Sequence, residues 1–98
     1  MTLNKNLDGK TLTIEIIGRL DTSTAPVLEE EISKSIGEIN KLVLDFAQLE
    51  YISSAGLRVL LKSQKTMSKQ GRMVVANASE TIKEVFELTG FMDILTLA

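Results

Sequence analysis

Hydrophobic and polar residues alternate at the start of the chain, and this alternation predicts a β-hairpin. Residues 3–7 place Leu, Lys and Leu between polar neighbours, and the dipeptide Asp8-Gly9 that follows is typical of two-residue hairpin turns. From residue 11 to residue 16, leucine and isoleucine alternate with threonine and glutamate, which is the pattern of a strand with one buried face. We therefore expect the fold to open with two antiparallel strands.

A first helix is predicted after a loop at residues 21–26. Thr24 supplies a hydroxyl cap, and Pro26 falls in the first turn, where proline is well tolerated. Three consecutive glutamates at residues 29–31 follow near the positive end of the helix dipole, and we expect them to form mainly a solvated helix start. The apolar face of this helix consists of Leu28, Ile32, Ile36 and Ile39.

Two further segments carry apolar residues at helical spacing. One is expected over residues 54–70, with Gly71 as the glycine that ends the helix. The other begins at Ser79, a capping residue, and ends at Gly90, while residues 91–97 are expected to form a short helical turn and a last strand. The apolar faces are Leu57, Leu60, Leu61 and Met67 for the first, and Ile82, Val85, Phe86 and Thr89 for the second.

Two short apolar runs, residues 42–46 and 72–76, predict strands that are covered on both faces. The expected order is ββαβαβα, so the strands after the hairpin should pair in parallel. The fold class is therefore α/β, with a mixed sheet covered by three main helices. Functional loops in such sheets lie at the carboxyl ends of the strands, and the loops at residues 18–26 and 48–56 are expected to converge there.

Composition limits the chemistry of the chain. Its 98 residues predict one domain over residues 1–98, and the low count of aromatic residues, one Tyr and three Phe, predicts an aliphatic core. A net charge of −2 and few aromatic side chains argue against nucleic-acid binding. The absence of cysteine and histidine excludes thiol catalysis and a Ser-His pair and disfavours zinc. We expect no cofactor, no metal and no enzymatic activity.

The N-terminal residues lack the apolar stretch of a signal peptide, and no apolar run reaches membrane-spanning length. From this we expect a soluble, cytoplasmic protein without a membrane partner.

Ser53 and Ser54 lie at the expected start of the second helix and allow two interpretations. One or both hydroxyl groups cap the helix, or one of them accepts a phosphate, which the unpaired backbone N–H groups and the helix dipole would favour. The two roles are compatible because both belong at the same exposed end. Gly56 in the first turn serves close packing, access by another protein, or flexibility of that turn.

Other candidate residues have a structural explanation beside a functional one. Asp21 opens the loop after the second strand, where a local turn or cap hydrogen bond is the simpler role. Asp45 ends a strand as in phosphate-accepting receiver domains, but the acidic pair and the lysine of those domains are missing. Arg58, Lys62, Lys65 and Lys69 form either a solvated helix face or a basic strip that docks an acidic partner.

Five segments in this order resemble a STAS domain, which anti-sigma factor antagonists share with the cytoplasmic tails of sulphate transporters. The resemblance covers nearly the whole chain, and no transmembrane part accompanies it, so the chain is similar to a free-standing bacterial antagonist. The segments are Gly18-Arg19-Leu20-Asp21, Thr24-Ala25-Pro26, Leu42-Val43-Leu44-Asp45-Phe46, Ser54-Ala55-Gly56-Leu57 and Leu88-Thr89-Gly90-Phe91.

The resemblance implies a partner switch. An unmodified antagonist binds an anti-sigma factor that is itself a serine kinase, and so releases a sigma factor. The kinase uses ATP to phosphorylate a serine, here Ser54, and a serine phosphatase reverses the loss of binding. The partner-binding residues that match are Asp21, Thr22, Ser23, Ser53, Ser54, Ala55, Gly56 and Arg58.

The chain departs from this family pattern at one position. Many antagonists have aspartate immediately before the acceptor serine, and this chain has Ser53. Ser53 is therefore a rival acceptor. The same departure supports an alternative function, a constitutive scaffold or interaction module that assembles with other STAS proteins or a membrane complex in a signalling assembly, without control by phosphorylation.

Overall fold

A computed structural model describes residues 1–98 of the chain. The fold opens with the predicted β-hairpin. The strands β1 (Thr2–Asp8) and β2 (Thr11–Leu20) pair in antiparallel register, with Asp8 opposite Thr11. Gly9 is the first of the two turn residues and has φ +62°, a conformation that favours glycine over residues with a Cβ atom. The two turn residues are therefore Gly9 and Lys10, one position later than the predicted Asp8-Gly9 pair, and Asp8 ends β1.

The rest of the sheet is parallel. The strands β3 (Lys41–Asp45) and β5 (Arg72–Ala76) extend it in the order β1-β2-β3-β5, and β3 pairs with the first half of β2. The second half of β2 pairs with β4 (Leu49–Ile52), a strand that the sequence analysis assigned to a loop. The strand β2 therefore changes neighbours between Glu15 and Gly18, and its pairing with β4 contains a register shift between Gly18 and Arg19.

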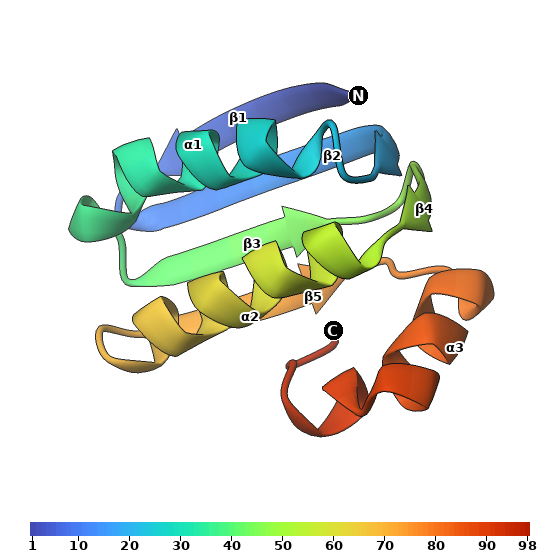
Figure 1. Cartoon of the computed structure of the whole chain (residues 1–98). Helices are drawn as coiled ribbons and strands as arrows, with labels where there is room; N and C mark the ends of the chain where they lie inside the picture. Colours follow the sequence, from blue (N-terminus) through green and yellow to red (C-terminus); the bar gives the residue numbers. More distant parts are fainter.

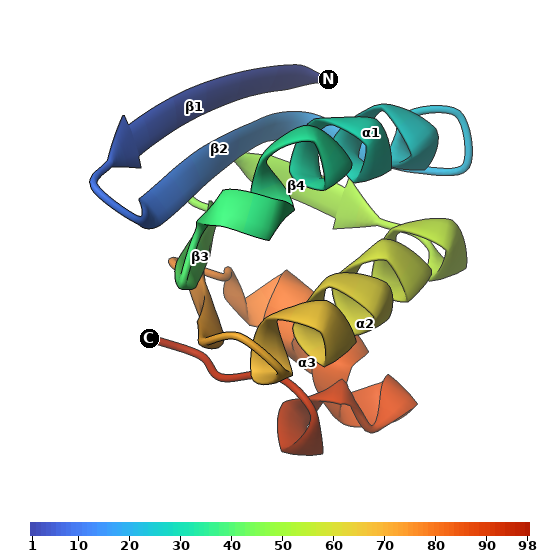
Figure 2. The same cartoon turned by 90° about the vertical axis from the view of Figure 1, so that its left-hand side faces the viewer.

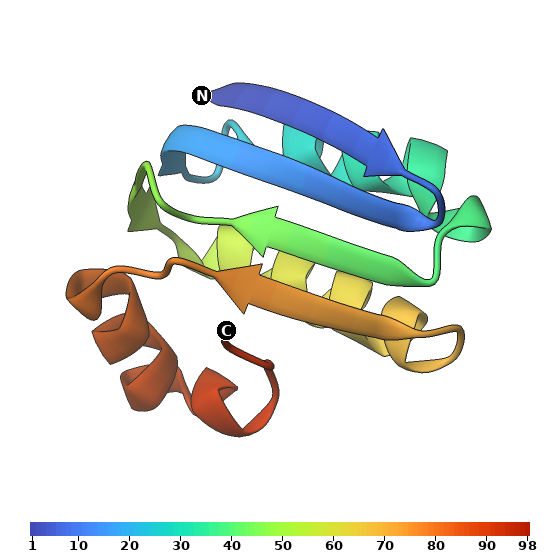
Figure 3. The same cartoon turned by 180° about the vertical axis from the view of Figure 1, so that it is seen from behind.

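Helices cover one face of the sheet. The helices α1 (Ala25–Ser35) and α2 (Ser54–Ser68) lie together on that face, and no helix lies on the opposite face (Figures 1 and 3). The side view shows the same two layers (Figure 2). The prediction of strands covered on both faces is wrong for β3, where buried and half-exposed residues alternate. Its exposed side carries Lys41, Val43 and Asp45, and lysine and aspartate tolerate water.

The last helix, α3 (Glu80–Thr89), lies beside the end of β5 (Figure 3). As predicted, the Ser79 hydroxyl caps it by accepting from the Ile82 amide, and Gly90 ends it with φ +80°. A short 3-10 helix, η2 (Phe91–Asp93), follows. The expected last strand is a single parallel bridge between Val75 and Leu97.

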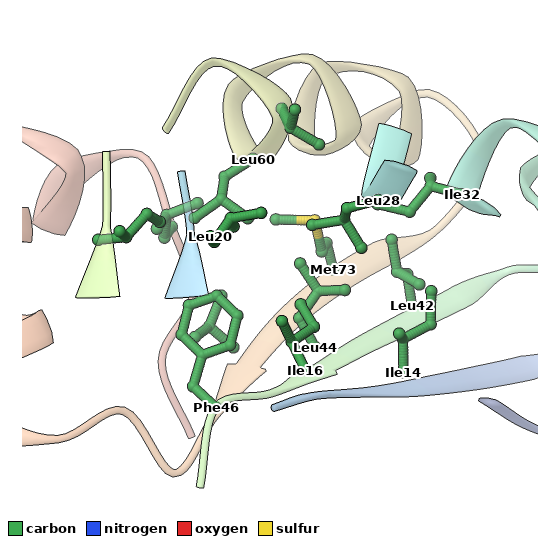
Figure 4. Packing of buried hydrophobic residues seen from close by; sticks show 14 of the residues in the cluster. Ile14, Ile16, Leu20, Leu28, Ile32, Leu42, Leu44, Phe46, Leu60 and Met73 are labelled. Carbon is green, nitrogen blue, oxygen red and sulfur yellow. The ribbon is translucent and has the colours of Figure 1, made fainter. Parts of the chain in front are cut away.

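The core lies between the sheet and the two covering helices. Leu28 and Ile32 of α1 and Leu60 of α2 point toward Ile14 and Leu44 of the sheet (Figure 4). The core is aliphatic as expected, apart from the rings of Phe46 and Phe86. These rings are fully buried, with centroids 6.4 Å apart.

Two details of the helix ends differ from the predictions. The helix α1 ends at Ser35 and continues as a 3-10 turn, η1 (Ile36–Glu38), so Ile39 is buried beyond the helix, in extended backbone. Gly71 lies after α2 without a positive φ. An added Cβ atom there would lie 1.8 Å from the carbonyl oxygen of Asn40, so close backbone approach explains this glycine.

Candidate functional site

Two loops meet at the carboxyl ends of β2 and β4. The Ser53 amide donates a hydrogen bond of 2.9 Å to the carbonyl of Leu20, the residue before Asp21. Leu20 and Ile52 are paired in the sheet, so Asp21 and Ser53 leave adjacent strands side by side. The predicted convergence of the two loops is confirmed, and β4 is the element that causes it.

Asp21 organises the first of these loops. Its Oδ1 atom accepts hydrogen bonds from the Ser23 amide and hydroxyl at 3.0 and 2.8 Å, and from the Thr24 amide at 3.1 Å. These donors stabilise the ionised form and lower the pKa of the Asp21 carboxyl below its ordinary value. Asp21 therefore fixes the shape of the loop that presents Thr22 and Ser23, both exposed to solvent.

Thr24 does not cap α1 with its side chain, contrary to the prediction. Its hydroxyl lies 2.8 Å from the Arg19 carbonyl and 2.8 Å from the Asp21 amide, and it binds both. The loop therefore closes on itself, and Pro26 supplies the predicted helix start. The three glutamates lie beyond the first turn, where Glu31 pairs with Lys5 across 2.7 Å.

The two serines at the start of α2 have different environments. Ser53 is the N-cap residue, and its hydroxyl accepts a hydrogen bond of 3.3 Å from the Gly56 amide. Ser54 is the first helical residue, and its exposed hydroxyl has no hydrogen-bond partner in the protein. No acidic residue lies in the first turn of this helix. The structure therefore separates the capping role from the free hydroxyl.

Because Ser53 caps α2 and Ser54 does not, the two serines are expected to differ in their contribution to stability. Ser53→Ala is expected to lower the free energy of unfolding by about 1 kcal/mol, because it removes the cap. Ser54→Ala is the matched control and should change it by less than about 0.5 kcal/mol, because an exposed residue loses no contact. Urea unfolding followed by circular dichroism measures both. Equal values for the two variants would contradict this assignment of the cap.

Gly56 holds the start of α2 against the strand ends. It is buried, and an added Cβ atom would lie 2.8 Å from Leu20 and 2.9 Å from Ile52. These distances are shorter than normal contacts between carbon atoms, so the helix approaches the sheet this closely only with glycine. Of the three roles open for Gly56, close packing is the one that its surroundings fit.

A shallow groove of about 250 Å³ lies between α1 and α2 beside Ser54. Lys62 and Glu29 bridge it with an ion pair of 2.6 Å. Arg58 lines the same groove, is exposed and forms no ion pair. Further along α2, Lys65 and Lys69 are also exposed and form no ion pair. The residues around the groove are Thr22, Ala25, Pro26, Glu29, Ala55, Arg58, Val59 and Lys62.

One interaction at this surface was not predicted from the sequence. The guanidinium carbon of Arg19 lies 4.2 Å from the centre of the Tyr51 ring, which is a cation–π contact. Arg19 is also 3.9 Å from Asp21, so it links the strand pair to the loop. Tyr51 lies in β4, a strand of only four residues. The alternation of polar and apolar residues over so short a segment is not enough to predict a strand from the sequence.

The structure shows no phosphate-accepting site at Asp45 and no metal site. Asp45 accepts hydrogen bonds from the Ala47 amide and the Asn77 side chain, both at 3.0 Å, which is a local loop role. No three acidic side chains gather as a metal site would require. None of the helices combines the length and the apolar character needed to cross a membrane.

The comparison with family models decides the family. The model described as the STAS domain matches residues 2–98. The chain belongs to the STAS domain family. Its mixed sheet, with an N-terminal antiparallel hairpin and three α-helices, is the STAS fold that the sequence analysis predicted.

Relatives place this STAS domain among the anti-sigma factor antagonists. It is 37% identical to BtrV of Bordetella bronchiseptica, named as an anti-sigma factor antagonist, over 100% of this chain and 84% of that protein. It is 30% identical to the anti-sigma-B factor antagonist of Bacillus subtilis, over 98% of this chain and 93% of that protein. Antagonists of this family are regulators without enzymatic activity, so the predicted non-enzymatic class is confirmed at the level of the family.

Solved structures show the same fold. The anti-sigma factor antagonist SpoIIAA in its unphosphorylated form has a TM-score of 0.85 at 22% identity, covering 99% of this chain and 88% of that one. The phosphorylated form of SpoIIAA from Bacillus has a TM-score of 0.78 at 23% identity, covering 99% and 91%. Both forms of that protein therefore share the fold described above.

Proposed function

We propose that this STAS domain is an anti-sigma factor antagonist whose binding to its anti-sigma factor is switched off by phosphorylation of Ser54. Two relatives at 30% and 37% identity carry the antagonist name, which supports the class of partner. The specific site rests on the geometry of α2. The partner is a serine kinase that uses ATP, and a serine phosphatase restores binding.

The free hydroxyl of Ser54 is the observation that carries the proposal. A kinase needs an accessible hydroxyl that is not already bound within the protein, and Ser54 is exposed and has no partner. Ser53 is half-buried, and its oxygen accepts from Gly56. Phosphorylation of Ser53 would place a bulky dianion where the cap now packs, so Ser54 is the better acceptor.

The unmodified surface around Ser54 suits a protein partner. Exposed Thr22 and Ser23 stand on the rigid Asp21 loop, and Arg58 lies one helical turn beyond Ser54 on α2. In addition, Tyr51 on β4, whose ring contacts Arg19 beside the Asp21 loop, is 41% exposed. Large apolar side chains beside polar groups are typical of the core of a protein interface.

The domain can carry the phosphate without refolding. Backbone N–H groups at the start of α2 and the helix dipole favour a negative charge at Ser54. The Arg58 guanidinium, four residues further on, is free to approach it. The fold that SpoIIAA retains in its phosphorylated form supports a switch that acts on the partner interface and leaves the sheet unchanged.

Phosphate mapping tests the proposal. The protein is incubated with ATP and a serine kinase of the anti-sigma type, and is then digested with trypsin. Cleavage after Lys41 and Arg58 gives a peptide whose only hydroxyl side chains are Tyr51, Ser53 and Ser54. Fragmentation of this peptide is expected to place the phosphate on Ser54.

Ser54→Ala should abolish incorporation, and Ser53→Ala is the matched control that should retain it. Phosphate on Ser53 in the wild type would move the switch to the neighbouring residue. No incorporation, together with equal kinase binding by Ser54→Asp and the wild type, would sink the proposal and favour the constitutive scaffold.

A further inference from the structure

Exposed hydrophobic side chains are concentrated near the C-terminus, away from the Ser54 end of the molecule. Leu88 is 82% exposed, and Met92 and Ile94 are each 40% exposed. These are three of the seven large hydrophobic residues with exposed side chains, and all lie within residues 88–94. Grouped apolar exposure of this kind marks interaction surfaces more often than isolated residues do. We call residues 88, 92 and 94 the apolar seam.

A basic groove borders the seam on one side. It has a volume of about 690 Å³ and is formed by the C-terminal half of α2 and Ile94 of the tail. Lys65 and Lys69 are exposed there, lie one helical turn apart and form no ion pair. Leu61, on the same helix, adds a half-buried apolar side chain to the groove. Two free ammonium groups therefore flank an apolar floor.

An acidic groove borders the seam on the other side. It has a volume of about 330 Å³ and is formed by α3 and Met92 of η2. Glu84 and Glu87 are exposed and form no ion pair, whereas Glu80 lies 3.9 Å from Lys83. Asp93 adds a further exposed carboxylate between Met92 and Ile94. In the view of Figure 1, η2 and the tail lie between α3 and the C-terminal half of α2, so the tail connects the two grooves.

We propose that this face binds a second copy of the same chain. A two-fold axis through the apolar seam would bring the lysines of one copy opposite the glutamates of the other, and the reverse pair would form at the same time. The seam residues would be buried between the two copies. The proposal goes beyond the Ser54 switch and does not depend on it.

Charge complementarity is the argument for this occupant. A surface with a free basic half and a free acidic half is complementary to itself, whereas an acidic or basic partner would match only one half. The net charge of −2 per chain opposes association only weakly. Lys65 lies about 16 Å along α2 from Ser54, so the switch site stays accessible in the dimer.

Association is measured by light scattering and sedimentation of the full chain from about 10 μM to about 1 mM, the range for small transient interfaces. The mass should rise with concentration from 10.8 kDa toward twice that value. Leu88→Gln should weaken association at least about tenfold without lowering stability, because the side chain is already 82% exposed. Leu7→Gln, at a residue 62% exposed on β1, is the matched control and should have no effect.

A charge swap gives the sharper test. The double variants Lys65→Glu with Lys69→Glu, and Glu84→Lys with Glu87→Lys, should each stay monomeric. Their equimolar mixture should recover the dimer, because every contact across the axis is then between opposite charges. Lys5→Glu with Lys34→Glu makes the same charge change beside β1, at the opposite edge of the sheet from β5, and should leave association intact.

A wild-type chain that remains monomeric at about 1 mM would overturn the proposal. Failure of the mixed double variants to associate would do the same. If the chain is monomeric and the lysine variants lose binding to the anti-sigma factor, the face belongs to that partner instead.

Discussion

Phosphorylation of Ser54 is expected to weaken binding of the anti-sigma factor by about 200- to 1,000-fold, which corresponds to about 3–4 kcal/mol. The modified residue would add close to two negative charges at a surface that the partner must cover. Covering a dianion removes its water, and an apolar or acidic partner surface supplies no compensating interaction. In the free protein, the helix start tolerates the same charge, so the cost falls on the complex.

Calorimetry with unmodified and fully phosphorylated protein measures this ratio. Ser53→Asp is the matched control, because it adds a negative charge one residue earlier and keeps a capping oxygen for the Gly56 amide. Many antagonists carry aspartate there, so binding of the unphosphorylated variant should change little. A comparable loss with Ser53→Asp would mean that the interface rejects any added charge and does not single out position 54.

Gly71→Ala is expected to lower the free energy of unfolding by about 3 kcal/mol or more. The added Cβ atom would lie 1.8 Å from the Asn40 carbonyl oxygen, and this oxygen also accepts the Arg72 amide at 3.0 Å. To remove this steric overlap, either the backbone that leads into β3 or the turn between α2 and β5 would have to move. Either movement breaks hydrogen bonds at the edge of the sheet.

Thermal unfolding measures this effect, and the expected fall in Tm is roughly 12 °C or more for a domain of this size. Gly37→Ala is the matched control, because Gly37 has an ordinary φ and no heavy atom within 4 Å of an added Cβ. That variant should keep or slightly raise the Tm through the smaller entropy of its unfolded chain. Similar values for the two variants would show that the loop at Asn40 yields easily.

Elements with strong local signals were predicted correctly from the sequence. The first hairpin turn, the Ser79 cap and the Gly90 terminus depend on a few neighbouring residues. The cap and the terminus appear as expected, and the turn lies at Gly9-Lys10, one position later than the Asp8-Gly9 pair. Helix periodicity also located α2, because its apolar residues recur over several turns. The alternation in β2 gave its buried face for the same reason.

Features that depend on distant contacts were missed or misassigned. The strand β4 has four residues and exists because Leu20 and its neighbours in β2 offer free backbone groups after β3 has ended. The apolar run at residues 42–46 predicted two covered faces, but Val43 is only half-buried because no helix packs behind the sheet. Thr24 followed the sequence rule for a cap, yet the Arg19 carbonyl and the Asp21 amide engage its hydroxyl.

The sequence by itself determined the α/β fold class, the hairpin, the helix starts and the serine pair at the entrance to α2. Local rules act over one turn, so they could not say which serine caps the helix. The tertiary structure decided this, because the closely packed Gly56 places its amide against the Ser53 oxygen and leaves Ser54 facing solvent. It also showed what brings Asp21 beside these serines, as the sequence predicted, since β4 pairs with β2 across residues far apart in the chain.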